Sequence, residues 1–309
     1  MVSPRNKTVL VICGPTAVGK TSVAIQLARH LSTEIISADS RQCYRELNIG
    51  VARPSADELQ QVPHHFIASH SIQDEVTAAS FEQYALQKAK ELFQQHDFVV
   101  MVGGTGLYIK AFCEGLDAIP AVDPAIRANI TRQYEEKGME WLQQQVMEKD
   151  PDFYRAGEIQ NPQRMMRALE VAEATGQSIL SFRSGKRAER YFNIIKIGLS
   201  LPKEELDRNI AARVDQMMAD GLLDEVKRLT PYKHLNALQT VGYAELFGHL
   251  DGKLTLEQAV ASIKTNTRRY AKRQMTWFRK DSAVRWFSPL QLKEIISYAE
   301  GVIREKEKS

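Results

Sequence analysis

A short stretch near the start of the chain combines the residue types that bind phosphate. The pattern G-x-x-x-x-G-K-[ST] is matched by Gly14, Pro15, Thr16, Ala17, Val18, Gly19, Lys20 and Thr21. In such a loop, backbone N–H groups and the positive end of the following helix face an anion. The Lys20 ammonium would reach the outer phosphates, and the Thr21 hydroxyl would hold Mg²⁺. The sequence therefore predicts a site for a phosphate-rich ligand without saying which one.

The elements around this loop fit that interpretation. Residues 8–13 form an apolar, β-branched run that predicts a buried strand, and residues 22–31 have helical spacing. Residues 34–37 predict a second strand, and Asp39 follows it. Ligands of open α/β sheets lie beyond the carboxyl ends of the strands, so we expect Asp39 to face the phosphate loop. The alternative is that Asp39 or Ser40 serves as a helix N-cap.

A third strand is predicted at residues 97–102, and Gly103, Gly104 and Thr105 follow it. In most phosphate-loop hydrolases and in many kinases, such a strand ends in a carboxylate that helps to hold Mg²⁺. Here glycines and a threonine stand at that place. Asp39 is therefore the one strand-end carboxylate that the sequence places near the loop.

The rest of the chain predicts an α/β protein, a parallel sheet flanked by helices, with an all-helical insertion. We expect helices at 78–95, 124–136, 139–149, 162–175 and 203–229, the last broken at Gly221, and a returning strand at 191–201. The predicted division is a core of residues 1–119 and 191–309 and an insertion of residues 120–190. Arginines of the insertion can face a polyanion or belong to ordinary solvated faces.

A long helix is expected at residues 255–280. Its second half, residues 264–280, holds seven Lys or Arg and no acid, with Tyr270, Trp277 and Phe278 between the charges. Basic residues with aromatics on a helix suit a nucleic-acid backbone. The alternative is a helix packed by its aromatics, with the charges in solvent.

Composition places few other limits on function. The chain has 309 residues, 43% hydrophobic and 26% charged, with a net charge of +3, as is ordinary for a globular protein. Its three distant cysteines favour neither a disulfide framework nor a metal site, and the adjacent pair His64 and His65 is interpreted as part of a loop or core edge. Without a predicted signal peptide or membrane span, we expect a cytoplasmic location.

A series of motifs then identifies a family. GPTAVGKT, SADSRQCYR, VPHH, VGGTGLYIKA, NPQRMMRALE, VGYAEL and TRRYAKRQMTWFR occur in this order between residues 8 and 280. Together they resemble the tRNA dimethylallyltransferases, or isopentenyl-tRNA transferases, in the form found in bacteria. A phosphate loop alone is weak evidence of a family, whereas an ordered series of motifs along nearly the whole chain is specific.

The resemblance implies a P-loop NTPase-like core that transfers a dimethylallyl group from dimethylallyl diphosphate to an adenosine just 3′ of the anticodon. The loop would hold the diphosphate with Mg²⁺, and the insertion would grip the anticodon arm of tRNA. Asp39 would be the general base, with Lys20 and Thr105 also catalytic. The residues implied to contact tRNA are Asp39, Ser40, Arg41, Gln42, Thr105, Arg127, Gln163, Arg164, Met165, Met166 and Arg167.

Two positions depart from the family pattern. Val51 lacks the usual hydroxyl and Ala68 replaces the usual aspartate, so neither is counted in the expected site. The alternative functions are a small-molecule kinase that uses ATP, a GTPase-like RNA-binding switch, and prenyl transfer to free adenine nucleotides. We expect a monomer. The sequence does not decide which tRNAs are modified or in which order the substrates bind.

Overall fold

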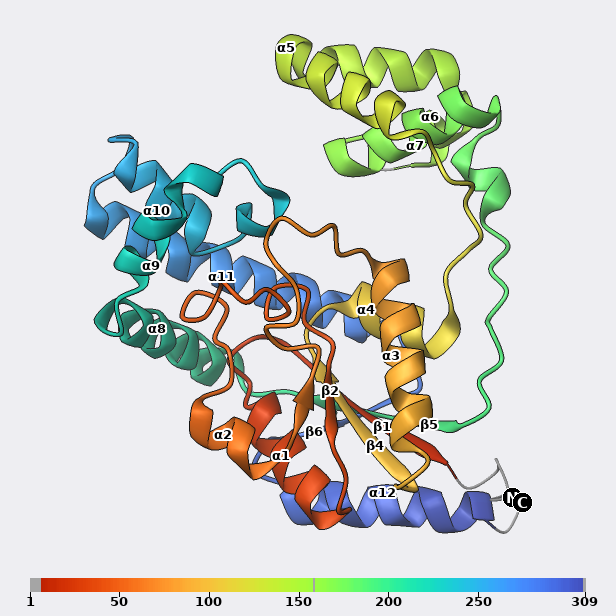
Figure 1. Ribbon diagram of the computed structural model, residues 1–309, viewed down its shortest axis with the longest axis vertical. Helices are drawn as coiled ribbons and strands as arrows, with labels where there is room; N and C mark the ends of the chain where they lie inside the picture. The colour runs from red at the N-terminus through yellow and green to blue at the C-terminus, as the bar shows by residue number, and fades with distance from the viewer. Residues whose placement is uncertain (1–6, 158, 308–309) are drawn as a thin grey trace. The chain divides into compact units, whose positions relative to one another are not determined.

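The computed structural model describes residues 7–157 and 159–307 (Figure 1). The expectation that no signal peptide opens the chain falls partly on residues 1–6, outside the described residues. The six parallel strands of the sheet run in the order β3-β2-β4-β1-β5-β6. Their bounds are β1 (Thr8–Cys13), β2 (Ile35–Ser37), β3 (His64–His65), β4 (Phe98–Gly103), β5 (Asn193–Leu199) and β6 (Val284–Phe287). The predicted α/β fold with a parallel sheet is confirmed.

Helices outside residues 115–188 cover both faces of this sheet. The helices of the described residues are α1 (Lys20–His30), α2 (Ala56–Gln61), α3 (Ala78–Leu92), α4 (Gly106–Glu114), α5 (Pro124–Lys149), α6 (Pro151–Ala156), α7 (Pro162–Thr175), α8 (Lys203–Ala219), α9 (Leu222–Leu229), α10 (Tyr243–Leu250), α11 (Leu256–Phe278) and α12 (Leu292–Glu307). The predicted helices at 162–175 and 203–229 are confirmed, the second with its break at Gly221, where φ is 96°.

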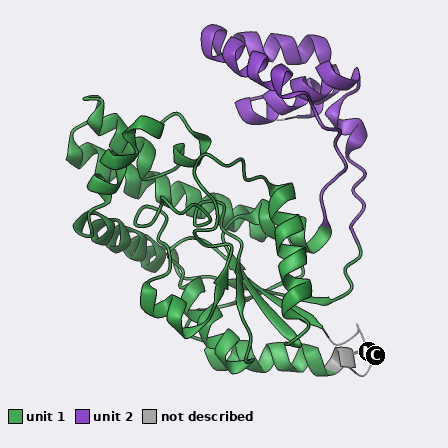
Figure 2. Ribbon diagram, in the orientation of Figure 1, with its two compact units in different colours: residues 1–114, 189–309 green, residues 115–188 purple. Residues whose placement is uncertain are grey.

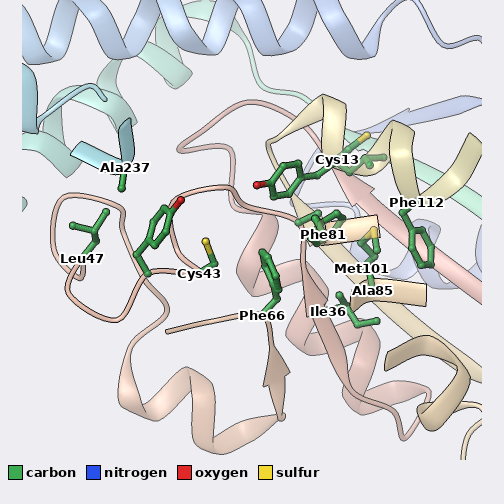
Figure 3. Close-up of a cluster of buried hydrophobic side chains, with 14 of the residues drawn as sticks. Cys13, Ile36, Cys43, Leu47, Phe66, Phe81, Ala85, Met101, Phe112 and Ala237 are labelled. Atoms are coloured by element: carbon green, nitrogen blue, oxygen red, sulfur yellow. The ribbon is translucent and has the colours of Figure 1, made fainter. Parts of the chain in front are cut away.

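The strands place alternate side chains on opposite faces, because successive residues of a strand point to opposite sides. Leu10 and Ile12 pack with α1 and α12 on one face. Val9 and Val11 face the other side, in a cluster with residues of α3, α4 and α9–α11. Figure 3 shows part of this second cluster, where Phe81 of α3 lies near the sheet. The buried sheet gives the loops at its carboxyl edge a rigid base.

Some elements were not predicted. They are α2, α4, α6, α10, α12, β3 and β6. The helix α4 follows directly on the glycines after β4, and the strands β3 and β6 are short edge strands that carry no long alternating pattern. The break predicted at Gly138 between helices at 124–136 and 139–149 is confirmed, because α5 is kinked there and Gly138 has a non-helical φ of 77°.

The chain divides into two compact units, shown in Figure 2. The first comprises residues 1–114 and 189–309, and the second comprises residues 115–188. The second unit contains α5, α6 and α7 around a core of its own, in which Leu142, Phe153 and Leu169 are buried. The insertion was predicted at residues 120–190, and the second compact unit spans residues 115–188.

Among the described residues, no helix is both long enough and apolar enough to cross a membrane. The three cysteines, Cys13, Cys43 and Cys113, are buried and form no disulfide. Burial raises the pKa of each thiol to about 12. Their thiols therefore stay protonated at neutral pH and serve as packing groups.

Candidate active site

The phosphate loop turns sharply out of β1 and into α1. At Gly14 φ is 146°, and a Cβ there would lie 2.6 Å from the carbonyl oxygen of Leu199 on β5, so glycine is required. Gly19, with φ of 96°, caps α1, and no side chain bonds the first N–H groups of this helix. The Thr16 N–H donates to the Gln274 side chain, so the backbone donors offered to an anion are those at the start of α1.

A cavity of about 360 Å³ lies over this loop. Thr16, Lys20 and Thr21 line it from the loop and α1, and Asp39 lines it from beyond β2. The structure thus brings the predicted base together with five of the predicted phosphate-binding residues, whereas Gly14, Pro15 and Val18 do not line the cavity. The sequence predicted that Asp39 would lie close to the phosphate loop, because each follows a parallel strand of the same sheet.

The Lys20 ammonium is held at the floor of the cavity. Its Nζ donates a hydrogen bond to the Pro15 carbonyl at 2.7 Å. Burial lowers the pKa of Lys20 to about 8, while the negative charge of Asp39 raises it and the Arg213 guanidinium lowers it. The protein alone therefore compensates the lysine charge incompletely, and an anionic ligand would complete the compensation.

Asp39 closes a turn and caps no helix. Its Oδ1 accepts hydrogen bonds from the backbone N–H of Arg41 at 2.9 Å and of Gln42 at 3.2 Å. The residues from Ser40 onward form turns, so the N-cap alternative is wrong and an Asx-type turn takes its place. These two bonds fix the carboxylate at the cavity wall.

Thr105 supports the same turn. Its Oγ1 accepts a hydrogen bond from the Ser40 N–H at 3.0 Å, and its hydroxyl lies 3.3 Å from the Ser40 hydroxyl. Its own N–H donates to the Ala38 carbonyl at 3.2 Å. At Gly103 a Cβ would come within 2.1 Å of that carbonyl, so only glycine allows β4 to approach so closely. Thr105 therefore joins the ends of β2 and β4.

Two residues of the cavity were missed at the sequence level. Gln274 of α11 is buried, accepts a hydrogen bond from the Thr16 N–H at 2.8 Å, and donates to the Gly104 carbonyl at 2.9 Å. Arg213 of α8 lines the cavity, its Nη1 3.5 Å from the Thr16 hydroxyl, and burial lowers its pKa. Gln274 shares a buried stripe with Ala271 and Phe278 at helical spacing, which is the pattern that indicates it.

The charges of α11 divide into two groups. Lys264 pairs with Asp215 at 2.6 Å, and Arg268 lies 3.8 Å from Asp207, both acids belonging to α8. Arg269, Lys272, Arg273, Arg279 and Lys280 are exposed. Of its three aromatics, only Phe278 is buried against the core, while Tyr270 and Trp277 are exposed beside the basic residues. A contact of this basic face with nucleic acid stays a prediction.

A second cavity, of about 130 Å³, adjoins the first. Thr16, Asp39 and Arg213 line both. Its other walls carry the apolar side chains of Ile210, Val214, Met217, Val241 and Ile263, together with Arg41, Thr240, Thr267 and Tyr270. A polar phosphate cavity thus continues into an apolar compartment, with a carboxylate and a guanidinium at the junction.

Two residues that line the phosphate cavity were not part of the expected site. Val51, which was left out of the expected site, lines both cavities. His64 lines the phosphate cavity, with Nδ1 2.8 Å from the Val62 carbonyl, while its partner His65 lies 2.6 Å from Glu34. Neighbouring residues of a strand point apart, so the two histidines do not meet. Ala68 does not line the cavity, and its N–H donates to the Gln42 carbonyl at 2.9 Å.

In the second unit, a buried carboxylate organises the arginines expected at tRNA. Glu170 is 2% exposed, 3.4 Å from Nε of Arg127 and 3.0 Å from Nη1 of Arg167. Gln163 and Arg164 are exposed at the start of α7. Met165 and Met166 are buried in the core of the unit. The expectation of a direct contact from these two methionine side chains is corrected, because helical periodicity turns them inward.

Known proteins resemble the chain along nearly its whole length. A model of the IPP transferase family matches residues 42–281. The tRNA dimethylallyltransferase of Christiangramia forsetii is 51% identical over 94% of this chain and 97% of its own. The tRNA dimethylallyltransferase 1 of Bacteroides thetaiotaomicron is 47% identical over 94% of both.

Solved structures agree in fold. The tRNA isopentenylpyrophosphate transferase of Bacillus halodurans matches with a TM-score of 0.73 and 35% identity over 98% of each chain. A eukaryotic dimethylallyltransferase, described as acting on tRNA, matches with a TM-score of 0.71 and 26% identity over 88% of this chain and 69% of its own. With its phosphate loop, parallel sheet and agreement in sequence, the chain belongs to the IPP transferase family.

Proposed function

We propose that this protein transfers the dimethylallyl group of dimethylallyl diphosphate to the exocyclic amine of the adenosine 3′ of the anticodon in certain tRNAs. The family and the names of the relatives support this reaction. The observation in the structure that carries the proposal is the junction of two cavities, one polar over the phosphate loop and one aliphatic. A diphosphate with a short branched hydrocarbon tail matches both halves.

The diphosphate would occupy the polar cavity. Backbone N–H groups of the loop, the Lys20 ammonium and the Arg213 guanidinium all converge there. Negative charge grows on the diphosphate as the allylic C–O bond breaks, and donors already in place stabilise it without reorganising. Gln274 contributes by fixing the Thr16 N–H and the Gly104 carbonyl relative to each other.

The oxygen donors of the polar cavity fit a magnesium ion. Thr21, Ser37 and Asp39 line it. Mg²⁺ prefers oxygen ligands, keeps several waters, and commonly binds through one or two side chains and substrate phosphates. We assign the Thr21 hydroxyl to the ion, which would neutralise charge on the diphosphate.

Asp39 is the proposed general base. The amine of adenine is a weak nucleophile, because its lone pair is delocalised into the ring. As its nitrogen bonds to the allylic carbon, the electron pair of the C–O bond leaves with the diphosphate and a proton leaves the amine. A carboxylate that accepts this proton accelerates such a step by about 10²–10⁴-fold. The turn that fixes Asp39 also keeps it at the cavity junction.

The tRNA would be held by both units. Within the first unit, the turn of Asp39–Gln42, supported by Thr105, would face the adenosine, which must leave its stack to be reached. Within the second unit, Arg127, Gln163, Arg164 and Arg167 would contact the anticodon arm, while Met165 and Met166 position α7 from inside. We further propose that the protein acts as a monomer in the cytoplasm, where it would meet tRNA.

A small-molecule kinase is the second candidate, since phosphate loops also bind ATP. Gly103 and Gly104 stand where many kinases carry a metal-binding carboxylate, and the aliphatic compartment suits no nucleotide phosphate chain. In the test, the protein is incubated with radiolabelled dimethylallyl diphosphate and either bulk tRNA or AMP. In a parallel assay it is incubated with ATP and a panel of kinase acceptors. Label in tRNA alone is expected. Label in AMP, or phosphorylation of an acceptor, would overturn the proposal.

A further inference from the structure

One buried carboxylate outside the two cavities holds the start of a backbone segment that lines them. Glu225 of α9 is 3% exposed. Its Oε2 accepts hydrogen bonds from the backbone N–H of Asn48 at 3.2 Å and of Ile49 at 2.8 Å. Its Oε1 accepts from the Gly50 N–H at 3.0 Å and from the Tyr243 hydroxyl at 2.6 Å. These four donors use the acceptor sites of the carboxylate, and three successive N–H groups form an anion-binding nest.

The segment held in this way, residues 48–53, forms a wall of the candidate active site through its residues 50–53. Val51, Ala52 and Arg53 line the phosphate cavity, and Gly50, Val51 and Ala52 line the aliphatic compartment. A Cβ at Gly50 would lie 2.6 Å from the Tyr243 ring, so the ring is packed directly on the backbone of this wall. Glu225 and Tyr243 therefore set how far the wall stands from the phosphate loop.

The same wall holds the turn that carries the proposed base. Nε2 of Gln42 donates hydrogen bonds to the carbonyl oxygens of Val51 at 3.2 Å and of Ala52 at 2.9 Å. The Gln42 N–H in turn donates to Asp39 Oδ1 at 3.2 Å. The Arg53 guanidinium ties the wall to the chain after this turn, donating to the Tyr44 carbonyl at 2.8 Å and to the Leu47 carbonyl.

We infer that Glu225 is a positioning residue for the transfer reaction, acting through the wall of residues 48–53 and the Gln42 side chain on the Asp39 carboxylate. This inference rests on the proposed function. Glu225 does not line either cavity. It affects the rate of transfer because the angle of attack at the allylic carbon depends on the positions of the base and of this wall. A displacement of about 1 Å at a reacting group can slow a reaction by up to about 10²-fold.

The test is Glu225→Gln in the full chain. The amide keeps the shape but turns an NH₂ toward groups that themselves donate, so the nest loses part of its bonding. We expect single-turnover transfer to tRNA to fall by at least about tenfold, with the affinity for dimethylallyl diphosphate changed by less than about threefold. Hydrogen exchange of the amides in residues 48–53 should speed up in the protein without ligands. Tyr243→Phe, which removes one donor and keeps the ring, should show smaller changes in the same direction.

A matched control separates positioning from stability. Asp150 is also a buried carboxylate, 1% exposed, that accepts backbone N–H bonds from Phe153 and Ile179, but it lies in the second unit. Asp150→Asn should lower the melting temperature without altering the affinity for dimethylallyl diphosphate or the exchange at residues 48–53. An unchanged rate in Glu225→Gln, or a lower melting temperature without faster exchange at 48–53, would overturn the inference. Absence of transfer by the unsubstituted protein would instead refute the proposed function, and the exchange measurement would still report on the wall.

Discussion

Lys20 gives the most direct test of the candidate site, because its charge should change within an accessible pH range. Burial lowers its pKa to about 8 from an ordinary value of 10.5. At pH 7 about nine-tenths of the lysine is protonated, at pH 8 about half, and at pH 9 about a tenth. A diphosphate is fully ionised above about pH 7.5, since the last phosphate pKa lies near 6. The charge of Lys20 therefore decides how its affinity varies at higher pH.

The expected size follows from this protonation. If the protonated lysine alone binds the diphosphate, the dissociation constant for dimethylallyl diphosphate should rise roughly tenfold from pH 7 to pH 9, or about 1.4 kcal/mol. The assay is calorimetric titration of the protein with this ligand without tRNA, at fixed ionic strength and Mg²⁺. Cys13 and Tyr270, whose pKa values are raised to about 12, do not ionise in this range.

Lys20→Arg is the matched control, because a guanidinium stays protonated throughout the range. Its affinity should be lower at pH 7, since the fork does not fit the lysine position, but it should vary little between pH 7 and pH 9. A dissociation constant of the unsubstituted protein that stays level from pH 7 to pH 9.5 would refute this account of Lys20.

Whereas the affinity for dimethylallyl diphosphate should fall as the pH rises, the free energy of unfolding of the unliganded protein should gain from the titration of Lys20. Between about pH 8 and 10.5 the unfolded chain holds more protons on Lys20 than the folded protein does, because folding lowers the pKa. The contribution of Lys20 to the free energy of unfolding should therefore rise with pH through this window. Saturating diphosphate should remove that rise, since the ligand favours the protonated lysine.

Three further predictions concern other parts of the site. Asp39→Asn should lower the single-turnover rate by about two or more orders of magnitude with tRNA affinity nearly intact, and near-normal rates would exclude Asp39 as the base. Replacing Arg269 and Arg273 by Gln should weaken tRNA binding. The slope of the logarithm of the tRNA binding constant against the logarithm of the salt concentration should become less steep by roughly 0.7–0.9 for each phosphate that is no longer neutralised. An unchanged slope with a lower melting temperature would assign the two arginines a structural role. Gly104→Ala should weaken dimethylallyl diphosphate binding, because the added Cβ would lie 2.3 Å from Nε2 of Gln274, and unchanged affinity by calorimetry would show that Gln274 does not hold the loop.

The sequence was sufficient to predict the structure wherever the residue types of one short segment determine its backbone conformation. Gly14 and Gly19 both have a positive φ that glycine adopts readily, so the pattern predicts the turn, the helix start and the anion site together. The parallel sheet follows from buried strands that alternate with helices, and it brings Asp39 to the same edge as Lys20. The helical insertion was evident from a change in periodicity.

Other features depend on contacts between segments far apart in the chain, and only the tertiary structure decided them. Gln274 is a polar residue within a basic run, and nothing local shows that its amide bridges Thr16 and Gly104. Arg213 and the aliphatic compartment arise where α8 passes the phosphate loop. Glu225 reads as one more acid on an amphipathic helix until its four donors are known. A hydrogen bond depends on distance and direction in space, whereas a sequence pattern records only spacing along the chain.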